Sequence, residues 1–256
     1  MNSPPLLIDK QDHIATVTLN RPEKGNALSM HLMEEIIGVA EAFHSDLETR
    51  VVIFKGAGKH FCLGADLKDP RQFAAADGPL LARQRSFNTG PRMIRALMEM
   101  NQITIAALHG LTLGGGACIA TALDFRTGTT DCRVGFPEIN LGIPLSWISL
   151  PLCVRLIGPA RAKRFVILGE KEDADTLVHW GFLDDIAEKD RLMSHAMKMA
   201  ESYAKKAPIP AQMIKRSINA IASALDQAVM HMDTDQVLLA QSAVGFQEGI
   251  KTVFEK

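Results

Sequence analysis

The sequence predicts an α/β fold with parallel strands, followed by a final third that is only helical. Up to Gly158, short β-branched or apolar runs such as Val51–Lys55 and Ile103–Leu108 alternate with segments of helical period. Such alternation is typical of parallel sheets. From Pro159 onward the pattern is helical throughout. No linker rich in Gly, Pro or Ser separates the two parts, so we expect them to pack together.

The individual elements can be predicted in chain order. Leu6–Asp9 and Ile14–Leu19 flank a polar Lys10–His13 and predict a hairpin. Apolar residues at helical spacing then predict a helix that Ser29 caps and that ends near His44. The other predicted elements are strands at Val51–Lys55, Ile103–Leu108, Phe125–Thr130 and Arg133–Phe136, and helices at Leu80–Met100, from Ala117, around Pro151, and at Ala160–Leu168, Ala174–Trp180, Arg191–Lys206, Pro210–Leu225 and Asp233–Phe246.

Composition, net charge and cysteine spacing limit which classes of function and partner we expect for this protein. The chain has 256 residues, 47% of them hydrophobic, which is enough for a large core, and a net charge of −1, which does not favour nucleic acid or an anionic membrane as partner. Its four cysteines form no CxxC pair, so no metal site is expected, and free thiols indicate a reducing, cytoplasmic location. The uncharged stretch Ile103–Leu123 is long enough to span a membrane, but its four glycines favour a buried strand, turn and helix.

A run of three glycines, Gly114–Gly116, follows the strand Ile103–Leu108 and precedes a helix. Glycine allows a ligand to approach the backbone closely, and the first N–H groups of a helix have no partner within it. No lysine or arginine lies between Ile103 and Asp124, so an oxyanion would meet backbone N–H groups there. By itself the run fits a close helix–sheet contact better than an oxyanion site.

Five segments taken together resemble the crotonase superfamily, also called the enoyl-CoA hydratase/isomerase family. They are NRPEKGNAL, HFCLGADLK, HGLTLGGGACIATALD, FPEINLG and GPARAKRFVILGE with WGFLDDI, and they cover almost the whole chain in family order. The resemblance implies a spiral of β-β-α units over residues 1–195 and a C-terminal helical region, 196–256, that forms homotrimers, which often pair into hexamers. It implies an acyl-CoA thioester as substrate and no separate cofactor, because coenzyme A is part of that substrate.

The resemblance also implies roles for individual residues. The backbone N–H groups of Ala65 and Gly115 would hold the thioester oxygen. Lys256 would reach the nucleotide, and Phe254 would close the acyl pocket. Of the residues expected to contact coenzyme A, the cations Arg21, Lys24, Lys68 and Lys256 fit ordinary exposed side chains equally well. The expected acyl-CoA contacts are Arg21, Lys24, Ala27, Ala65, Asp66, Leu67, Lys68, Gly114, Trp147, Phe254 and Lys256.

Two departures from the family pattern concern the reaction. Hydratases of this family carry two glutamates; here Glu138 stands in the PE pair, but Cys118 occupies the place of the other. One base is sufficient to move a double bond, whereas hydration uses two carboxylates that share a water. Leu145, Ser146 and Trp147 replace a Gly-rich turn and leave less room for water. These features favour an isomerase with Glu138 as base.

Alternatives stay open at this point. A hydratase (a lyase) with an altered second acid and a non-catalytic acyl-CoA binding protein both fit the missing glutamate. Cys118 could be a nucleophile, although no base can be assigned to it. His60 and His109 flank the two expected oxyanion loops and could donate hydrogen bonds, but structural roles are commoner for such histidines.

Overall fold

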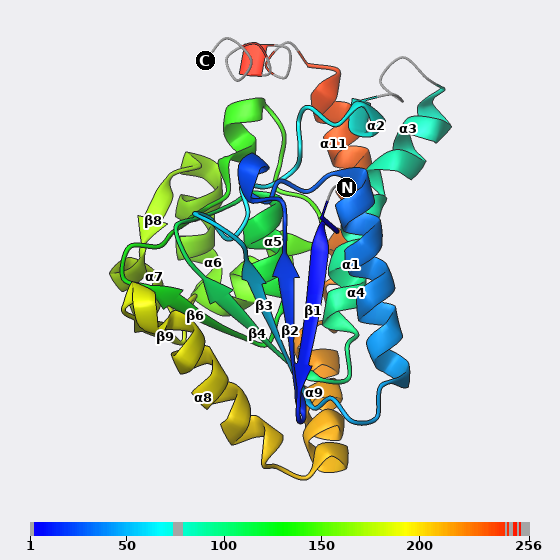
Figure 1. Cartoon of the computed structure of the whole chain (residues 1–256). Coiled ribbons are helices and arrows are strands. Elements are labelled where there is room, and N and C mark those ends of the chain that lie inside the picture. The colour runs from blue at the N-terminus through cyan, green and yellow to red at the C-terminus, as the bar shows by residue number, and fades with distance from the viewer. Residues whose placement is uncertain (1–2, 74–78, 244, 246–247, 250, 252–256) are drawn as a thin grey trace.

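A six-stranded sheet lies at the centre of the molecule (Figure 1). The structure is a computed structural model that describes residues 3–73, 79–243, 245, 248–249 and 251. From one edge to the other, the sheet consists of β1 (Leu6–Gln11), β2 (Ile14–Leu19), β3 (Val51–Gly56), β4 (Ile103–Leu108), β6 (Phe125–Thr129) and β9 (Asp185–Ala187). Neighbouring strands are parallel except in the antiparallel β1–β2 hairpin. The predicted hairpin and parallel core are therefore confirmed.

A second, three-stranded sheet stands beside the first. It consists of β5 (Leu111–Leu113), β7 (Arg133–Gly135) and β8 (Lys171–Asp173), with β5 and β7 parallel and β8 antiparallel to β7. The prediction that the chain is only helical after Pro159 is wrong, because both β8 and β9 lie in that part. Strands of three residues are too short to show an alternating pattern, so periodicity does not detect them.

Helices surround both sheets. Among the described residues they are α1 (Met30–Ala42), α2 (Pro70–Phe73), α3 (Leu80–Phe87), α4 (Thr89–Met98), α5 (Gly115–Ala122), α6 (Ser149–Leu168), α7 (Ala174–Trp180), α8 (Leu192–Ala204), α9 (Pro208–Ala222), α10 (Gln227–Met230) and α11 (Asp233–Gln241). In the described part of the chain, no helix combines the length and the apolar character needed to cross a bilayer.

Two predicted helices differ from the structure because of proline. The segment 80–100 divides at Asn88, and Pro91 then lies in the first turn of α4. Proline has no N–H to bond the preceding turn, but this is no loss at the start of a helix. For the same reason Pro151 lies in the first turn of α6 and not near its middle. The later bend in α6 is at Gly158, whose φ of 77° is non-helical.

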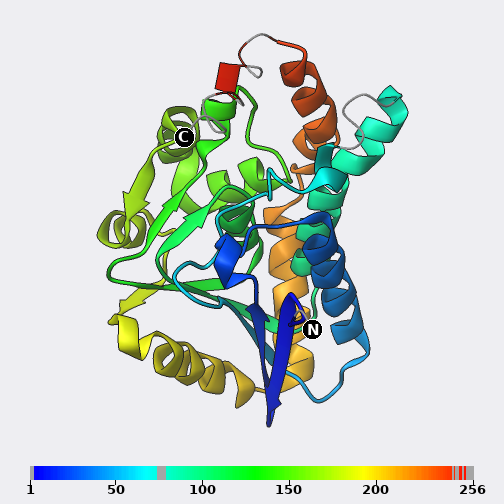
Figure 2. The same ribbon diagram turned by 45° about the horizontal axis from the view of Figure 1, so that its top comes forward.

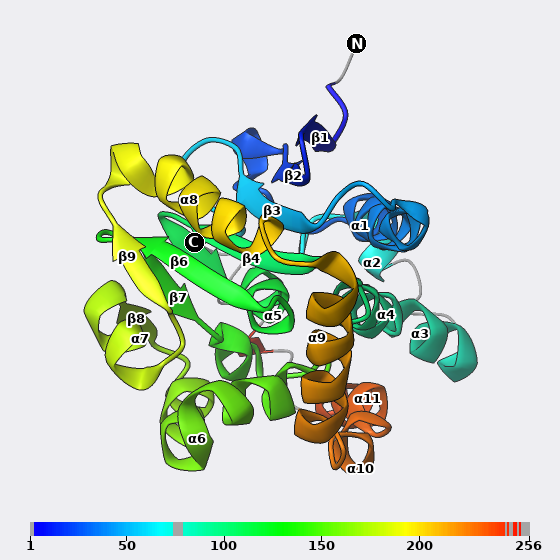
Figure 3. The ribbon, with the colours of Figure 1, turned by 90° about the horizontal axis from the view of Figure 1, so that it is seen from below.

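The central strands of the main sheet are buried on both faces, and Figure 3 shows from below that α8 lies on one side of them and α5 on the other. Val52 and Phe54 of β3 join the core beneath α1, α4 and α5, whereas Val51 and Ile53 point to the other face, against α8. A strand with two buried faces is a continuous apolar run, which explains the sequence VVIF.

The C-terminal helices do not form one separate layer. α8 runs through residue 195, the predicted end of the core, and packs on β3, β4 and β6. Further along, α11 lies against α3 at the far end of the molecule (Figure 2). Assembly through residues 196–256 stays a prediction.

Candidate functional site

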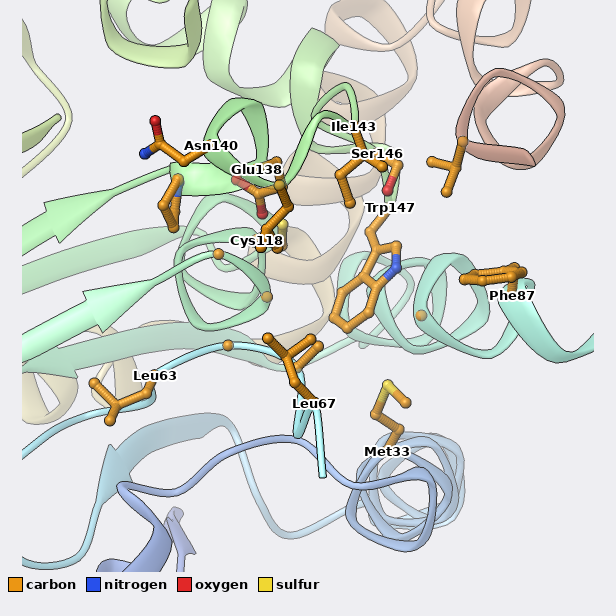
Figure 4. A pocket seen from close by; sticks show the side chains of 18 of the residues that line it. Met33, Leu63, Leu67, Phe87, Cys118, Glu138, Asn140, Ile143, Ser146 and Trp147 are labelled. Atoms are coloured by element: carbon orange, nitrogen blue, oxygen red, sulfur yellow. The ribbon is translucent and has the colours of Figure 1, made fainter. Parts of the chain in front are cut away.

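A cavity of about 580 Å³ opens where the segments after β3, β5 and β7 meet (Figure 4). Sites in sheets with parallel strands commonly form in the loops that follow the strands, where segments distant in sequence come together. The lining of this cavity is mainly apolar. Its residues are Met30, Met33, Leu63, Gly64, Ala65, Leu67, Ser86, Phe87, Gly90, Gly114, Gly115, Cys118, Pro137, Glu138, Asn140, Leu141, Ile143, Ser146, Trp147, Lys171, Val237 and Gln241.

The backbone of Ala65 is oriented by its neighbours. Leu28 N donates to Gly64 O at 2.8 Å, and Asp66 N donates to Leu28 O at 3.0 Å. Alternate residues of an extended strand point their backbone groups to opposite sides. The N–H of Ala65 therefore points away from Leu28, and Ala65 itself lines the cavity.

Gly115 presents its N–H for a different reason. It is the first residue of α5, and the first amides of a helix lack intrahelical acceptors. The preceding Gly114 has φ 50° and ψ −120°, a conformation open in practice only to glycine. Within the described residues, neither the Ala65 N–H nor the Gly115 N–H has a protein acceptor. Both are thus available to an oxyanion.

The two backbone segments touch each other. A Cβ atom at Gly64, whose φ is 96°, would lie 3.0 Å from Leu113 O and 3.3 Å from Gly115 N. The bridge between Cys62 and Thr112 joins the same segments one step earlier. The structure therefore brings the predicted amides of Ala65 and Gly115 to adjoining parts of one cavity wall.

Glu138 lies next to this wall, in the short 3-10 helix Pro137–Leu141 that follows β7. A Cβ at Gly114 would be 3.1 Å from Glu138 Oε1, so the absence of a side chain there makes room for the carboxyl group. Glu138 Oε2 is buried without a hydrogen-bond partner among the described residues. Burial raises the pKa of the Glu138 carboxyl to about 7. It is also the only acidic side chain among the described residues of the lining.

Cys118 lies beside Glu138, on the same side of the cavity (Figure 4). Burial and the nearby Glu138 carboxylate raise the pKa of this thiol well above its ordinary value, although a hydrogen bond with Ser149 acts against the shift. The thiol therefore stays protonated near neutral pH and is a weak nucleophile.

The other end of the cavity is an apolar compartment. Met33 comes from α1, Phe87 from α3 and Val237 from α11. The indole of Trp147 lies between the Met33 and Phe87 side chains and the Glu138 side chain (Figure 4). Trp147 thus lines the cavity as predicted. The sequence did not single out Met33, Phe87 or Val237, because nothing in their local pattern distinguishes them from core residues.

Two predicted contacts of coenzyme A take part in internal interactions instead of lining the cavity. Arg21 donates through Nη1 to Ala27 O and forms an ion pair with Asp66, with Nη2 and Oδ2 2.9 Å apart. The side chains of Arg21 and Asp66 are only 15% and 8% exposed. This pair therefore holds the segment before α1 against the segment that carries Ala65.

The remaining predicted contacts are distributed as follows. Gly114 and Leu67 line the cavity, whereas Ala27 and the exposed Lys24 and Lys68 do not. Phe254 and Lys256 lie outside the described residues. Of the two histidines, His60 accepts a hydrogen bond from Leu111 N at 3.1 Å, and His109 Nε2 lies 3.1 Å from Gly58 O. Neither histidine lines the cavity, so a structural role fits both.

Comparison with known proteins agrees with this geometry. Residues 9–256 match the family model described as enoyl-CoA hydratase/isomerase. The short-chain-enoyl-CoA hydratase of Clostridium acetobutylicum is 31% identical over 216 residues, which cover 84% of this chain and 80% of that protein. The crotonyl-CoA hydratase of Syntrophomonas wolfei is 27% identical over 98% of this chain and 95% of its own length.

A solved structure extends the similarity to three dimensions. An enoyl-CoA hydratase/isomerase from Xanthobacter autotrophicus Py2 superimposes with a TM-score of 0.85 at 25% identity and covers 98% of this chain and 97% of that one. The family model matches nearly the full length, and the strand-end cavity is lined by Ala65, Gly115 and Glu138 from three of the motifs. The chain belongs to the enoyl-CoA hydratase/isomerase family, the crotonase superfamily.

Proposed function

We propose that this protein is an enoyl-CoA isomerase that moves a double bond of an acyl-CoA thioester with Glu138 as its single base. The observation that carries the proposal is the buried, unpartnered Glu138 carboxyl, whose pKa is raised to about 7, in the cavity that also contains the Ala65 and Gly115 amides. A base with a pKa near the working pH can both take up and return a proton.

The proposed reaction has two proton transfers. Glu138 removes a proton from the carbon next to the thioester carbonyl of a 3-enoyl-CoA, and the electron pair moves onto the carbonyl oxygen. The N–H groups of Ala65 and Gly115 stabilise this enolate, and the loss of one such donor typically costs about 3 kcal/mol. Glu138 then returns the proton two carbons further along, and the double bond comes to lie next to the carbonyl.

Cys118 supports isomerisation over hydration. Addition of water to a double bond needs one group to activate the water and a proton for the other carbon. A protonated thiol beside Glu138 is a weaker partner for that water than a second carboxylate. The cavity lining is also largely apolar, which disfavours a stably held water.

Hydration is the second candidate, and the relatives favour it. The Clostridium and Syntrophomonas proteins are both named as hydratases. The two candidates differ in the substrate that is consumed, since a hydratase converts 2-enoyl-CoA in water and an isomerase converts 3-enoyl-CoA without adding water.

The test follows both conversions with purified protein. We expect 3-enoyl-CoA to become conjugated and 2-enoyl-CoA to gain no water. Glu138→Gln should lower isomerisation at least about a thousandfold while acyl-CoA binding changes little, because the carboxamide keeps the shape and loses the base. Glu35→Gln, on the exposed side of α1, is the matched control and should keep full activity. Addition of water would establish the hydratase, and tight binding without turnover would establish a binding protein.

A further inference from the structure

The indole of Trp147 is packed between two glycines that are far apart in the sequence. A Cβ at Gly90 would overlap the ring atoms Cε2, Cδ2 and Nε1 of Trp147. A Cβ at Gly115 would lie 2.5 Å from Cζ3 and 3.0 Å from Cη2 of the same ring. The side chain can occupy this place only because both positions lack a Cβ.

The backbone at Trp147 is also held in an unusual conformation. Trp147 and Ile148 both have positive φ, 56° and 65°, a region that β-branched and bulky residues rarely adopt. Asp233, at the start of α11, holds the turn through Oδ2, which accepts from Ile148 N at 2.6 Å. Ser149 Oγ donates to Trp147 O at 3.1 Å. A conformation of this kind persists only where surrounding contacts impose it.

The position of the indole ring places it in the path of an acyl chain bound in the cavity. Its edge lies next to Gly115, one of the two residues proposed to hold the thioester carbonyl. Met33 and Phe87 of the apolar compartment lie beyond it (Figure 4), and Val237 lines the same cavity. An acyl chain that starts at the Gly115 amide therefore meets the indole before it can enter that compartment.

We propose that Trp147 limits the acyl chain to a short one, and that Gly90 is the positioning residue that keeps the indole across the cavity. This inference rests on the proposed function in one respect, namely that an acyl-CoA binds with its carbonyl at Ala65 and Gly115. It does not depend on whether the reaction is isomerisation or hydration.

The first experiment measures binding of saturated acyl-CoAs of increasing length by calorimetry, so that no turnover is needed. In the unaltered protein, affinity should stop increasing after the shortest chains. In Trp147→Ala, each further methylene that enters the freed compartment should improve affinity about fourfold, as expected for a buried methylene. Equal dependence on chain length in both proteins would overturn the proposal.

The second experiment tests Gly90. Gly90→Ala should displace the ring and weaken binding of short acyl-CoAs at least about tenfold, while Gly38→Ala in α1, where nothing lies within 4 Å of the added Cβ, should change nothing. The three nearest atoms to a Cβ at Gly90 all belong to Trp147. The double variant Gly90→Ala/Trp147→Ala should therefore bind like Trp147→Ala alone.

The double variant also excludes a simple folding defect, because it carries the same alanine at position 90. If it stayed as impaired as Gly90→Ala, the role of Gly90 would be refuted. A protein that bound no acyl-CoA of any length would refute the proposed function itself. The same dependence of affinity on chain length in the unaltered protein and in Trp147→Ala, together with normal turnover, would refute only the role of Trp147.

Discussion

At the scale of single residues, the proposed function depends on one carboxyl group. Glu138 Oε2 is buried without a partner among the described residues, and Oε1 lies over Gly114. Burial disfavours the charged form, which is why the pKa of this carboxyl is raised to about 7. Ionisation of the carboxyl group that performs the proposed proton transfer therefore lowers the stability of the folded protein.

The rate should follow the ionisation of Glu138. Only the carboxylate can accept a proton, so kcat/KM for a 3-enoyl-CoA should rise about tenfold per pH unit at low pH and level off above the pKa of about 7. The measurement is a pH profile of initial rates with acyl-CoA binding recorded in parallel. A rate that does not change between pH 5 and pH 9 would mean that another group is the base.

The pH dependence of the protein's stability should also reflect the ionisation of the Glu138 carboxyl group. Its folded-state pKa of about 7 exceeds the ordinary glutamate pKa of 4.5, so between these values the folded state holds a proton that the unfolded state releases. The contribution of Glu138 to the free energy of unfolding is fully present below pH 4.5 and is lost as the pH rises through about 7. Glu138→Gln cannot ionise and should be more stable than the unaltered protein at pH 8, by at most about 3 kcal/mol.

Urea unfolding at two pH values checks this prediction. All other titrating groups are the same in both proteins, so the difference between them isolates Glu138. At pH 4 the free energies of unfolding of the unaltered protein and of Glu138→Gln should approach each other. A variant that is less stable than the unaltered protein at pH 8 would show that the carboxylate has a stabilising partner.

At the scale of elements, segments distant in the chain are tied together around the cavity. The Arg21–Asp66 pair joins the segment before α1 to the segment after β3, and the hydrogen bonds of Leu28 continue this connection beside Ala65. The direction of the Ala65 N–H thus depends on side chains that do not line the cavity.

Asp66→Asn tests this connection. It leaves the Arg21 charge partly buried without its partner, which should lower the free energy of unfolding by about 2–4 kcal/mol and reduce kcat more than it changes KM. The matched control is Glu34→Gln, which breaks the exposed Arg71–Glu34 pair. Exposed pairs contribute little, so this change should leave the free energy of unfolding nearly unchanged. Equal effects of the two variants would contradict the supporting role of Asp66.

At the scale of the whole molecule, α9 buries a charged side chain and exposes apolar ones, which packing within a single chain does not explain. Its only buried residue is Lys215, which pairs with Asp124 at 2.7 Å. Large apolar side chains of the same segment are exposed instead: Ile209, Met213, Ile214, Ile218, Ile221 and Leu225. An exposed apolar surface of this kind marks an interaction site.

We therefore expect copies of this chain to associate through α9, as trimers or pairs of trimers. Light scattering should give a mass of three or six chains, and Ile218→Asp combined with Ile221→Asp should shift it toward the monomer, because charges would be buried in the contact. Leu47→Asp, at an apolar residue that is 89% exposed elsewhere, is the control. A monomer at micromolar concentration, before any change, would refute the expectation.

Much of the fold could be predicted because its signals are local. Runs such as VVIF and the helical periods in α1, α7 and α8 lie within single elements, so burial imposes a pattern that the sequence displays. The short strands β5, β8 and β9 and the division between α3 and α4 were not predicted. Three residues carry no period, and one proline can either end a helix or begin one.

The sequence by itself determined the family, the two amide-bearing segments at Ala65 and Gly115, and the base candidate Glu138, because each lies in a contiguous motif. Only the tertiary structure decided that Arg21 pairs with Asp66, that Glu138 Oε2 has no partner among the described residues, and that the Trp147 ring fits between Gly90 and Gly115. These features depend on contacts between residues far apart in the chain. Local patterns of hydrophobicity and turn residues record burial within one element, but not which distant side chain occupies the neighbouring space.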